Sequence, residues 1–276
     1  MDPQAAAPAP SPAVAAPSSF WRAATLTLLS AAACVSLAAQ QPTPRPEEAA
    51  QFALIVNNDD SFTHNLNVKL AVAALEHLGY RAENILVIAH ASSQELELPA
   101  AVRRGPASRQ GLAEALRYLK SALRQRDLLL VYLTGDGTRA FGRSIVSLQG
   151  GHVTAPAFAN SLGELPFARL ILIADQCYSG GFVSAVAGVG RDVVAVSSAD
   201  ERHQIRCEPF VRTLWDTAVG GQDTGGAAGA SRNASVEEAF RAGAANLAKG
   251  EPTAAPQYAA SGRCKGHENS FSLPPG

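Results

Sequence analysis

Short apolar runs alternate with amphipathic stretches along most of this chain. The apolar runs predict strands over residues 52–57, 84–89, 127–134, 170–174 and 192–198, with a short last strand over 257–260. The amphipathic stretches predict helices over residues 67–78, 108–123, 156–162, 209–219 and 235–248. Residues 144–154 alternate around Gly150-Gly151, which predicts a small hairpin. The order of these elements predicts an α/β fold with a mostly parallel sheet of about six strands and helices on both faces.

The first fifty residues differ in composition from the rest. Residues 1–22 are rich in Pro, Ala and Ser, and residues 23–39 are uncharged and moderately apolar. This pattern predicts a signal peptide over 1–39, with a signal anchor as the alternative. We therefore expect an exported protein, periplasmic or secreted, or one held at the membrane by this segment.

The remaining sequence divides by composition into a linker, a domain and a tail. Residues 40–50 read as a proline-rich linker, 51–262 as the folded domain with a Gly-rich loop over 220–233, and 263–276 as a C-terminal tail. With 276 residues, 47% of them hydrophobic, the chain can bury a sizeable core. A net charge of −1 gives no indication of a nucleic-acid partner or of membrane contact beyond the N-terminal segment. The oligomeric state is left open.

A cysteine stands directly after one of the predicted strands. The strand over 170–174 is followed by Asp175-Gln-Cys177-Tyr-Ser179-Gly-Gly181. Ligand sites of open α/β sheets lie at this end of the strands, and small residues leave room for a turn close to a substrate. Cys177 is therefore a candidate nucleophile, and a small buried residue in a strand–helix corner is the alternative.

Two strand ends together resemble the caspase, metacaspase and legumain superfamily of cysteine peptidases. One strand ends at Thr134-Gly-Asp-Gly137, and the other at the cysteine motif. In that superfamily one strand ends in His-Gly and the next long strand ends at the nucleophilic cysteine. Further similarity to bacterial members lies in three segments, residues 105–116, 193–207 and 235–240 with the later 256–258. The resemblance implies a caspase-like three-layer sandwich from about residue 52 to residue 260.

The resemblance also implies roles for single residues. Cys177 matches the nucleophile, and Gly137 matches the glycine after the catalytic histidine. The amides of these two residues would form an oxyanion hole. Asp175 matches a position that lines the specificity pocket, where an acid implies a preference for Arg or Lys, while a structural carboxylate that accepts backbone N–H bonds is the alternative. Residues 57–60 lie where legumains keep a polar residue that orients the histidine.

The chain departs from the superfamily at the histidine itself, because Asp136 stands in that position. An imidazolium stabilises the reactive thiolate, whereas a carboxylate repels it. We therefore expect slow alkylation of Cys177 at neutral pH. His152, after the hairpin glycines, and His203, in the loop after the fifth strand, are candidate replacement bases, with His64 a weaker third. No ligand spacing supports a metal site, and we expect no cofactor.

The other cysteines suggest a disulfide. After loss of a signal peptide three cysteines remain, and the simplest arrangement pairs Cys207 with Cys264 and leaves Cys177 as a thiol. Three reduced cysteines are the alternative.

Two hypotheses for the function follow. The first is an exported cysteine-endopeptidase fold with an incomplete Cys/His dyad, weakly active or a pseudopeptidase that binds peptides or a protein partner. The second is an active cysteine endopeptidase with Cys177 as nucleophile, a relocated histidine base and a basic preference at the cleavage site.

Overall fold

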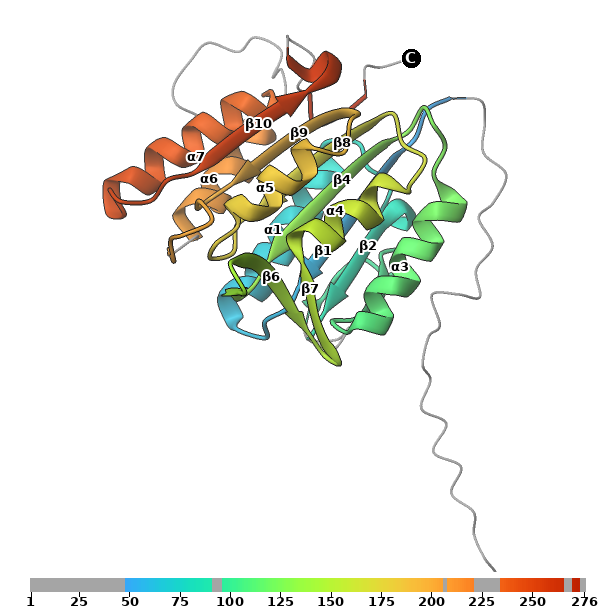
Figure 1. The fold of residues 1–276 in the computed structure, drawn as a ribbon. Helices are drawn as coiled ribbons and strands as arrows, with labels where there is room; N and C mark the ends of the chain where they lie inside the picture. Colours follow the sequence, from blue (N-terminus) through green and yellow to red (C-terminus); the bar gives the residue numbers. More distant parts are fainter. Residues whose placement is uncertain (1–47, 91–95, 206–207, 221–233, 266–269, 274–276) are drawn as a thin grey trace, which may run out of the picture. The chain divides into compact units, whose positions relative to one another are not determined.

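A seven-stranded sheet runs through the described part of the protein (Figure 1). The structure is a computed structural model that describes residues 48–90, 96–205, 208–220, 234–265 and 270–273. In sheet order the strands are β10 (Gln257–Ser261), β9 (Asp192–Ser197), β8 (Arg169–Ala174), β4 (Leu128–Thr134), β1 (Gln51–Asn57), β2 (Ile85–Ala89) and β3 (Arg103–Pro106). All neighbours are parallel except β10, which is antiparallel to β9.

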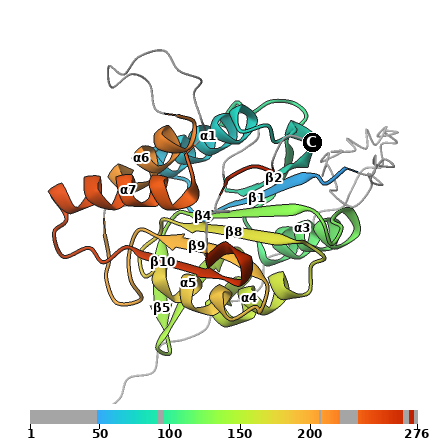
Figure 2. The same ribbon diagram turned by 90° about the horizontal axis from the view of Figure 1, so that it is seen from above.

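Helices cover both faces of this sheet, as Figure 2 shows. On one face lie α1 (Phe62–His77), α6 (Glu208–Ala218) and α7 (Val236–Gly250). On the other lie α3 (Arg109–Ala122), α4 (Ala155–Gly163) and α5 (Gly180–Ala187). The described residues also include the short 3-10 turns η2 (Ala82–Asn84) and η3 (Gly262–Lys265). The predicted α/β class with a mostly parallel sheet is confirmed, with seven strands in place of about six.

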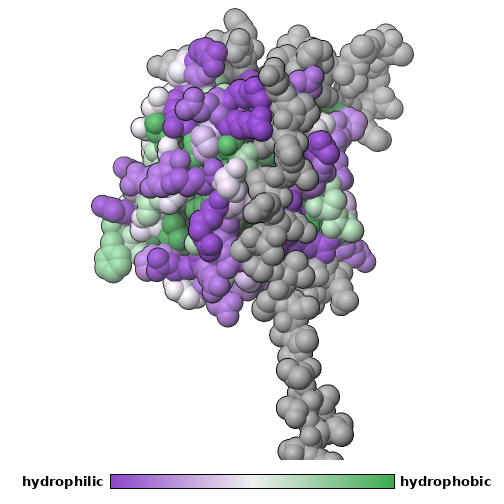
Figure 3. Space-filling model, turned by 90° about the vertical axis from the view of Figure 1, so that its right-hand side faces the viewer, coloured by the Kyte–Doolittle hydropathy of each residue, from purple (hydrophilic) through white to green (hydrophobic). Residues whose placement is uncertain are grey.

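The strands are apolar because each of them faces a core on both sides. In β4, every residue from Leu128 to Thr134 is buried, and its side chains alternate between the core under α3, α4 and α5 and the core under α1, α6 and α7. Burial of a side chain such as leucine contributes roughly 2 kcal/mol. On the face drawn in Figure 3, hydrophilic residues predominate and hydrophobic ones are scattered.

Serine side chains fix where three helices begin. Ser108 accepts a hydrogen bond from the Gly111 N–H at the start of α3, and Ser235 forms the expected capping box with Glu238 at the start of α7. Ser61 caps α1 in the same way. The sequence-based helix start at residue 67 was therefore wrong by one and a half turns, because the first turn of α1 is mostly polar and its Phe62 is 83% exposed.

A small antiparallel sheet stands beside the main one. It consists of β5 (Gly137–Ala140), β6 (Arg143–Leu148) and β7 (Gly151–Thr154), in that order. The expected hairpin is the β6–β7 pair. The sequence did not predict β5, because its four residues carry no apolar run. It likewise missed β3, a polar strand at the sheet edge, and α5.

Several expectations fall on residues outside the described ranges. The signal peptide over 1–39, most of the linker over 40–50, Cys207 and most of the Gly-rich loop over 220–233 are among them. Of the helices that the structure describes, none combines the length and apolar character needed to cross a membrane.

Candidate active site at the C-terminal edge of the sheet

Four parallel strands end side by side at one edge of the main sheet. The register pairs Asn57 of β1 with Thr134 of β4, and Ala174 of β8 with Ser197 of β9. Because β4 also pairs with β8, the segments that follow these strands meet at the same edge. The two motifs that the sequence singled out, at residues 134–137 and 175–181, therefore lie next to each other as expected.

Cys177 is half-buried in a turn that other parts of the chain hold in place. Its thiol donates a hydrogen bond to the Ile205 carbonyl, with 3.6 Å between sulfur and oxygen. The next residue, Tyr178, has φ +58°, a backbone conformation that is unfavourable for a bulky side chain. Its N–H donates to the His203 carbonyl at 3.0 Å, and its carbonyl accepts the Ser144 hydroxyl at 2.6 Å. The loop after β9 and the strand β6 thus fix the cysteine turn from two sides.

The small residues after Cys177 make room for this protein's own backbone. A Cβ atom on Gly180 would lie 2.7 Å from the Asp200 backbone, and one on Gly181 would lie 2.2 Å from the Ser144 hydroxyl. The Ser179 hydroxyl accepts the Ala199 N–H at 3.2 Å. These small residues therefore let neighbouring segments of the chain pack tightly against the turn, and the expected proximity of a substrate stays a prediction.

Gly137 lies directly against the backbone of Cys177. A Cβ atom at position 137 would be 2.0 Å from the Cys177 carbonyl oxygen and 2.7 Å from its nitrogen. The turn after β4 and the turn after β8 are therefore in backbone contact, which is the juxtaposition that the resemblance implied. An oxyanion hole made of the two amides stays a prediction.

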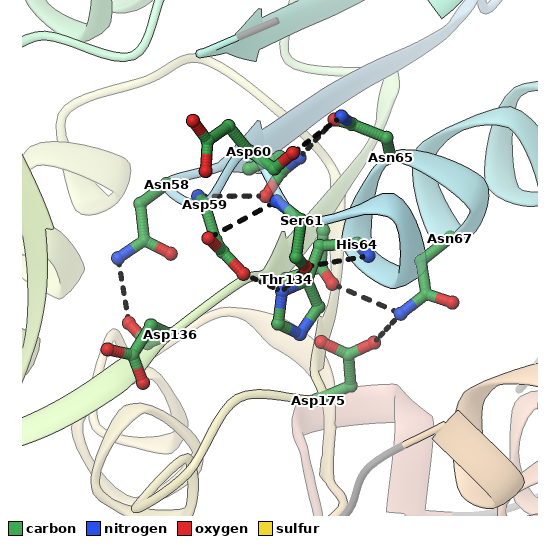
Figure 4. Close-up of polar contacts among 11 residues, drawn as sticks. Asn58, Asp59, Asp60, Ser61, His64, Asn65, Asn67, Thr134, Asp136 and Asp175 are labelled. Carbon is green, nitrogen blue, oxygen red and sulfur yellow. Dashed lines mark hydrogen bonds and ion pairs between the residues drawn. The ribbon is translucent and has the colours of Figure 1, made fainter.

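Asp136 is exposed, and it is positioned by its backbone. Its carbonyl accepts the Asn58 side-chain N–H at 2.7 Å (Figure 4). Asn58 can approach this closely because Gly135 has no side chain, since a Cβ there would lie 2.0 Å from Asn58 Oδ1. The residue in the segment 57–60 that contacts position 136 is thus Asn58. Because water screens an exposed carboxylate, Asp136 repels a nearby thiolate less than a buried carboxylate would.

A buried row of polar residues runs across the sheet beneath this edge. Its members occupy one register position on four neighbouring strands or directly after them, and all are buried: Asn57, Thr134, Asp175 and Ser198. From α1, Asn67 donates to both Thr134 Oγ1 and Asp175 Oδ2 at 3.4 Å (Figure 4). Most of the strand positions before this row are apolar and buried, so the row lies at the boundary between the core and the C-terminal edge of the sheet.

Asp175 is fully buried within this row. Its carboxylate accepts the Tyr132 hydroxyl at 2.5 Å. Burial raises the pKa of Asp175 to about 6, although the Tyr132 hydrogen bond and the charge of His64 oppose the rise. The structural alternative fits this burial, with side-chain donors in addition to a backbone N–H, and the substrate-pocket role stays a prediction.

This carboxylate should make folding stability depend on pH. Its folded pKa of about 6 exceeds the ordinary value of 3.8, so its contribution to stability is present below pH 4 and is lost as the pH rises through 6. We expect Asp175→Asn to abolish a loss of roughly 3 kcal/mol between pH 4 and pH 7, measured by urea unfolding.

Tyr132→Phe serves as the matched comparison. It removes the hydrogen bond that lowers the pKa of Asp175, so it should enlarge the loss. An Asp175→Asn variant that keeps the wild-type pH dependence would contradict the assignment.

Buried polar atoms without a hydrogen-bond partner among the described residues gather at this edge. They are Asn58 Oδ1, Asp175 Oδ1, both amide atoms of Gln176, and Ser198 Oγ. Buried polar groups in folded proteins are nearly always hydrogen-bonded. Such a gathering after β1, β8 and β9, at one edge of the sheet, is typical of a ligand-binding edge.

Among the described residues, the hydrogen-bond partner of the Cys177 thiol is Ile205 and neither candidate replacement base. His152 is exposed on β7 and pairs with Ser147 of β6. Because β6 separates β7 from Gly137 of β5, two strand spacings, about 10 Å, lie between them. The structure therefore does not bring His152 to the cysteine.

His203 lies closer, through its backbone. Its carbonyl accepts the Tyr178 N–H, and its ring Nδ1 is 2.8 Å from Asp200 Oδ1. The ring is thus oriented by a carboxylate on the loop that covers the cysteine turn. The thiol itself is bonded to Ile205, two residues further along.

A second carboxylate–imidazole pair lies at the end of β1. His64 Nδ1 is 2.5 Å from Asp59 Oδ2 and 3.0 Å from Ser61 Oγ (Figure 4). Both contacts use the same ring nitrogen, whereas a catalytic triad uses one for the acid and the other for the nucleophile. Ser61 is the cap of α1. These three residues therefore order the start of the helix.

The remaining site expectations concern metal and disulfide chemistry. Within the described ranges, no three His, Cys, Asp or Glu side chains gather in a way that could hold a metal ion. Cys264 is buried beneath the face that carries α1, α6 and α7. Its predicted partner Cys207 is outside the described residues, so the bridge stays a prediction.

Comparison with known proteins yields a structural similarity alone. No family model matches the chain, and no curated protein matches it. Among solved structures it is similar to the Drosophila initiator caspase Dronc, with 8% sequence identity and a TM-score of 0.45, covering 76% of this chain and 79% of that chain. A similarity this distant gives no information on activity or on individual residues.

Proposed function

We propose that this protein has a caspase-like cysteine-peptidase fold with an incomplete Cys/His dyad. On this proposal it is a pseudopeptidase or a weakly active peptidase that binds a peptide or protein partner at the cysteine edge. The observation that carries the proposal is the surroundings of Cys177: Gly137 lies against its backbone, and an exposed Asp136 precedes that glycine.

The proposed defect is a lack of activation of the thiol. A cysteine nucleophile reacts as the thiolate, which a neighbouring imidazolium normally stabilises. Among the described residues, the one polar contact of the Cys177 thiol is the Ile205 carbonyl, to which it donates its proton. A carbonyl oxygen accepts a hydrogen bond but takes up no proton, so Ile205 cannot act as the base that generates a thiolate.

Alkylation of Cys177 tests this proposal. At pH 6 we expect iodoacetamide to label Cys177 at less than about 1% of the limiting rate at high pH, because the thiolate is the reactive form and the thiol is hydrogen-bonded to a carbonyl and not to an imidazole among the described residues. Peptide mass mapping follows the site of labelling, and Cys177→Ser supplies the background from other cysteines. Rapid labelling at pH 6 would contradict the proposal.

An active endopeptidase is the second candidate, and one observation favours it. The Asp200–His203 pair is a carboxylate-oriented imidazole on the loop that contacts the cysteine turn. If wild type cleaves fluorogenic peptides, and both Cys177→Ala and His203→Gln abolish the cleavage, this candidate replaces the first.

The partner class and the location complete the proposal. The buried Asp175 and the exposed Asp136 make the edge acidic, which supports a preference for peptides with Arg or Lys at the residue held there. We also propose export, from the composition of residues 1–39. Detection of a mature N-terminus near residue 39 in the exported fraction would test it.

A further inference from the structure

The tip of the β5–β6 hairpin, residues 139–143, exposes an aromatic side chain between two arginines. Phe141 is 96% exposed, and Arg139 and Arg143 on either side of it are exposed as well. Arg139 donates a hydrogen bond to the Gly142 carbonyl at 3.4 Å. Within the described ranges neither guanidinium is paired with a carboxylate. Figure 2 shows the hairpin that contains β5 projecting on the side of α4 and α5.

Phe141 occupies a hairpin-loop position whose backbone conformation is more favourable for asparagine or glycine. It forms, with Gly142, the two-residue loop between the paired Ala140 and Arg143, and both loop residues have positive φ, +51° and +75°. Such loops favour Asn-Gly, and a bulky residue at positive φ is unfavourable. Burial does not compensate, since the side chain is in water. An exposed aromatic side chain at a position of unfavourable backbone conformation, between two exposed arginines, is a candidate contact for another molecule.

The register places one arginine on the side of the cysteine. Arg139 is opposite Ser144 in the β5–β6 pair, so the two side chains share one face of the hairpin. Ser144 bonds to the Tyr178 carbonyl, which shows that this face is turned toward the cysteine turn. Arg139 lies two residues, about 7 Å, from Gly137, and the tip lies beyond it. A peptide extending from Cys177 along the hairpin would meet Arg139 first and Phe141 next.

We propose that the hairpin tip is a docking surface for an acidic segment of a protein partner. A carboxylate of the partner pairs with Arg139, and an apolar side chain covers Phe141. The proposal rests on the proposed function in one respect, since the same partner extends over the cysteine edge. We favour an acidic protein segment over an anionic bilayer as the occupant. A bilayer would be repelled by the exposed Asp136, which directly precedes β5, and by the chain's net charge of −1.

Binding of short peptides to the full-length protein tests the docking surface. The probe is the fluorescein-labelled peptide Gly-Asp-Glu-Phe-Asp-Gly, followed by anisotropy, with its Lys-for-acid counterpart as the comparison. We expect the acidic peptide to bind more tightly and Arg139→Glu and Phe141→Asn each to weaken it by about tenfold. The Phe141→Asn variant should also unfold at a higher temperature, since asparagine suits the loop.

Two variants elsewhere serve as matched controls. Phe62 is 83% exposed at the start of α1, and Arg117 is exposed on α3. Phe62→Ser and Arg117→Glu should leave peptide binding unchanged. Equal binding by the tip variants and wild type would overturn the proposal, as would absence of binding by wild type.

The last measurement is sedimentation with vesicles of phosphatidylcholine containing 30% phosphatidylserine, which tests binding to an anionic membrane surface. Binding to these vesicles that depends on Phe141, without binding of the acidic peptide, would overturn the proposal in favour of a membrane surface. Rapid alkylation of Cys177 at pH 6 would refute the proposed dyad defect but leave the docking surface standing. Slow alkylation of Cys177 together with peptide binding that does not depend on the hairpin tip would refute the docking surface and leave the proposed dyad defect standing.

Discussion

Replacing Asp136 by histidine should raise the rate of Cys177 alkylation at pH 6 by about tenfold. An imidazole neighbour brings thiol pKa values to 6 or below, which raises the thiolate fraction at pH 6 about 100-fold over that of an ordinary thiol. A thiolate of lower pKa is also less nucleophilic, which lowers the alkylation rate by about a factor of ten and leaves a net rise of about tenfold. Position 136 accepts the change because its side chain is exposed and Asn58 holds its backbone carbonyl.

Asp136→Asn separates the two reasons why the Cys177 thiol should react slowly, which are repulsion by the Asp136 carboxylate and the lack of an imidazole beside it. It removes the negative charge without supplying an imidazole, and because the carboxylate is exposed we expect a change of less than about threefold. The same series should be assayed with fluorogenic peptides containing Arg or Lys, where Asp136→His raises cleavage. An equal rise in both variants would mean that repulsion by the carboxylate, and not the absent base, limits the thiol.

Gly137→Ala should destabilise the protein by about 3 kcal/mol. The new methyl group would lie 2.0 Å from the Cys177 carbonyl oxygen, and the atoms it meets are backbone, which cannot move aside like the end of a side chain. The turn at Cys177 is also held by Ser144 and His203, so little relaxation is open to it. Urea unfolding measures the loss.

Gly250→Ala is the matched control for this substitution. Gly250 ends α7, and a Cβ there meets no atom within 4 Å. Alanine favours helices over glycine, so stability should stay the same or rise slightly. If the two variants unfold alike, the close approach of Gly137 and Cys177 is not a feature of the folded protein.

Patterns of apolar residues along the sequence were sufficient to predict the strands that face a core on both sides. The run Leu128–Thr134 is apolar because both faces of β4 are covered, and such a run is visible without coordinates. The strands β3 and β5 carry no such pattern, since β3 lies at a sheet edge and β5 belongs to the small sheet. The start of α1 was missed because a polar first turn gives no periodic signal.

The meeting of two strand ends at one edge was predictable from the sequence, but the contacts made there were not. Cys177 and Gly137 were assigned to one edge from strand order and resemblance, and their backbones do touch. The partner of the thiol is a main-chain carbonyl, which leaves no mark on the sequence. Asp175 accepts a hydrogen bond from Asn67 of α1, a residue 108 positions away that no local pattern connects to it.

The way residue 136 is held has an evolutionary consequence. Its backbone is anchored by Asn58 while its side chain projects into water, so the identity of that side chain is nearly decoupled from folding. Aspartate and histidine codons differ in their first base alone. On the proposed function, a single base change would therefore convert the protein between a form without the imidazole and one that carries it, with little effect on the fold.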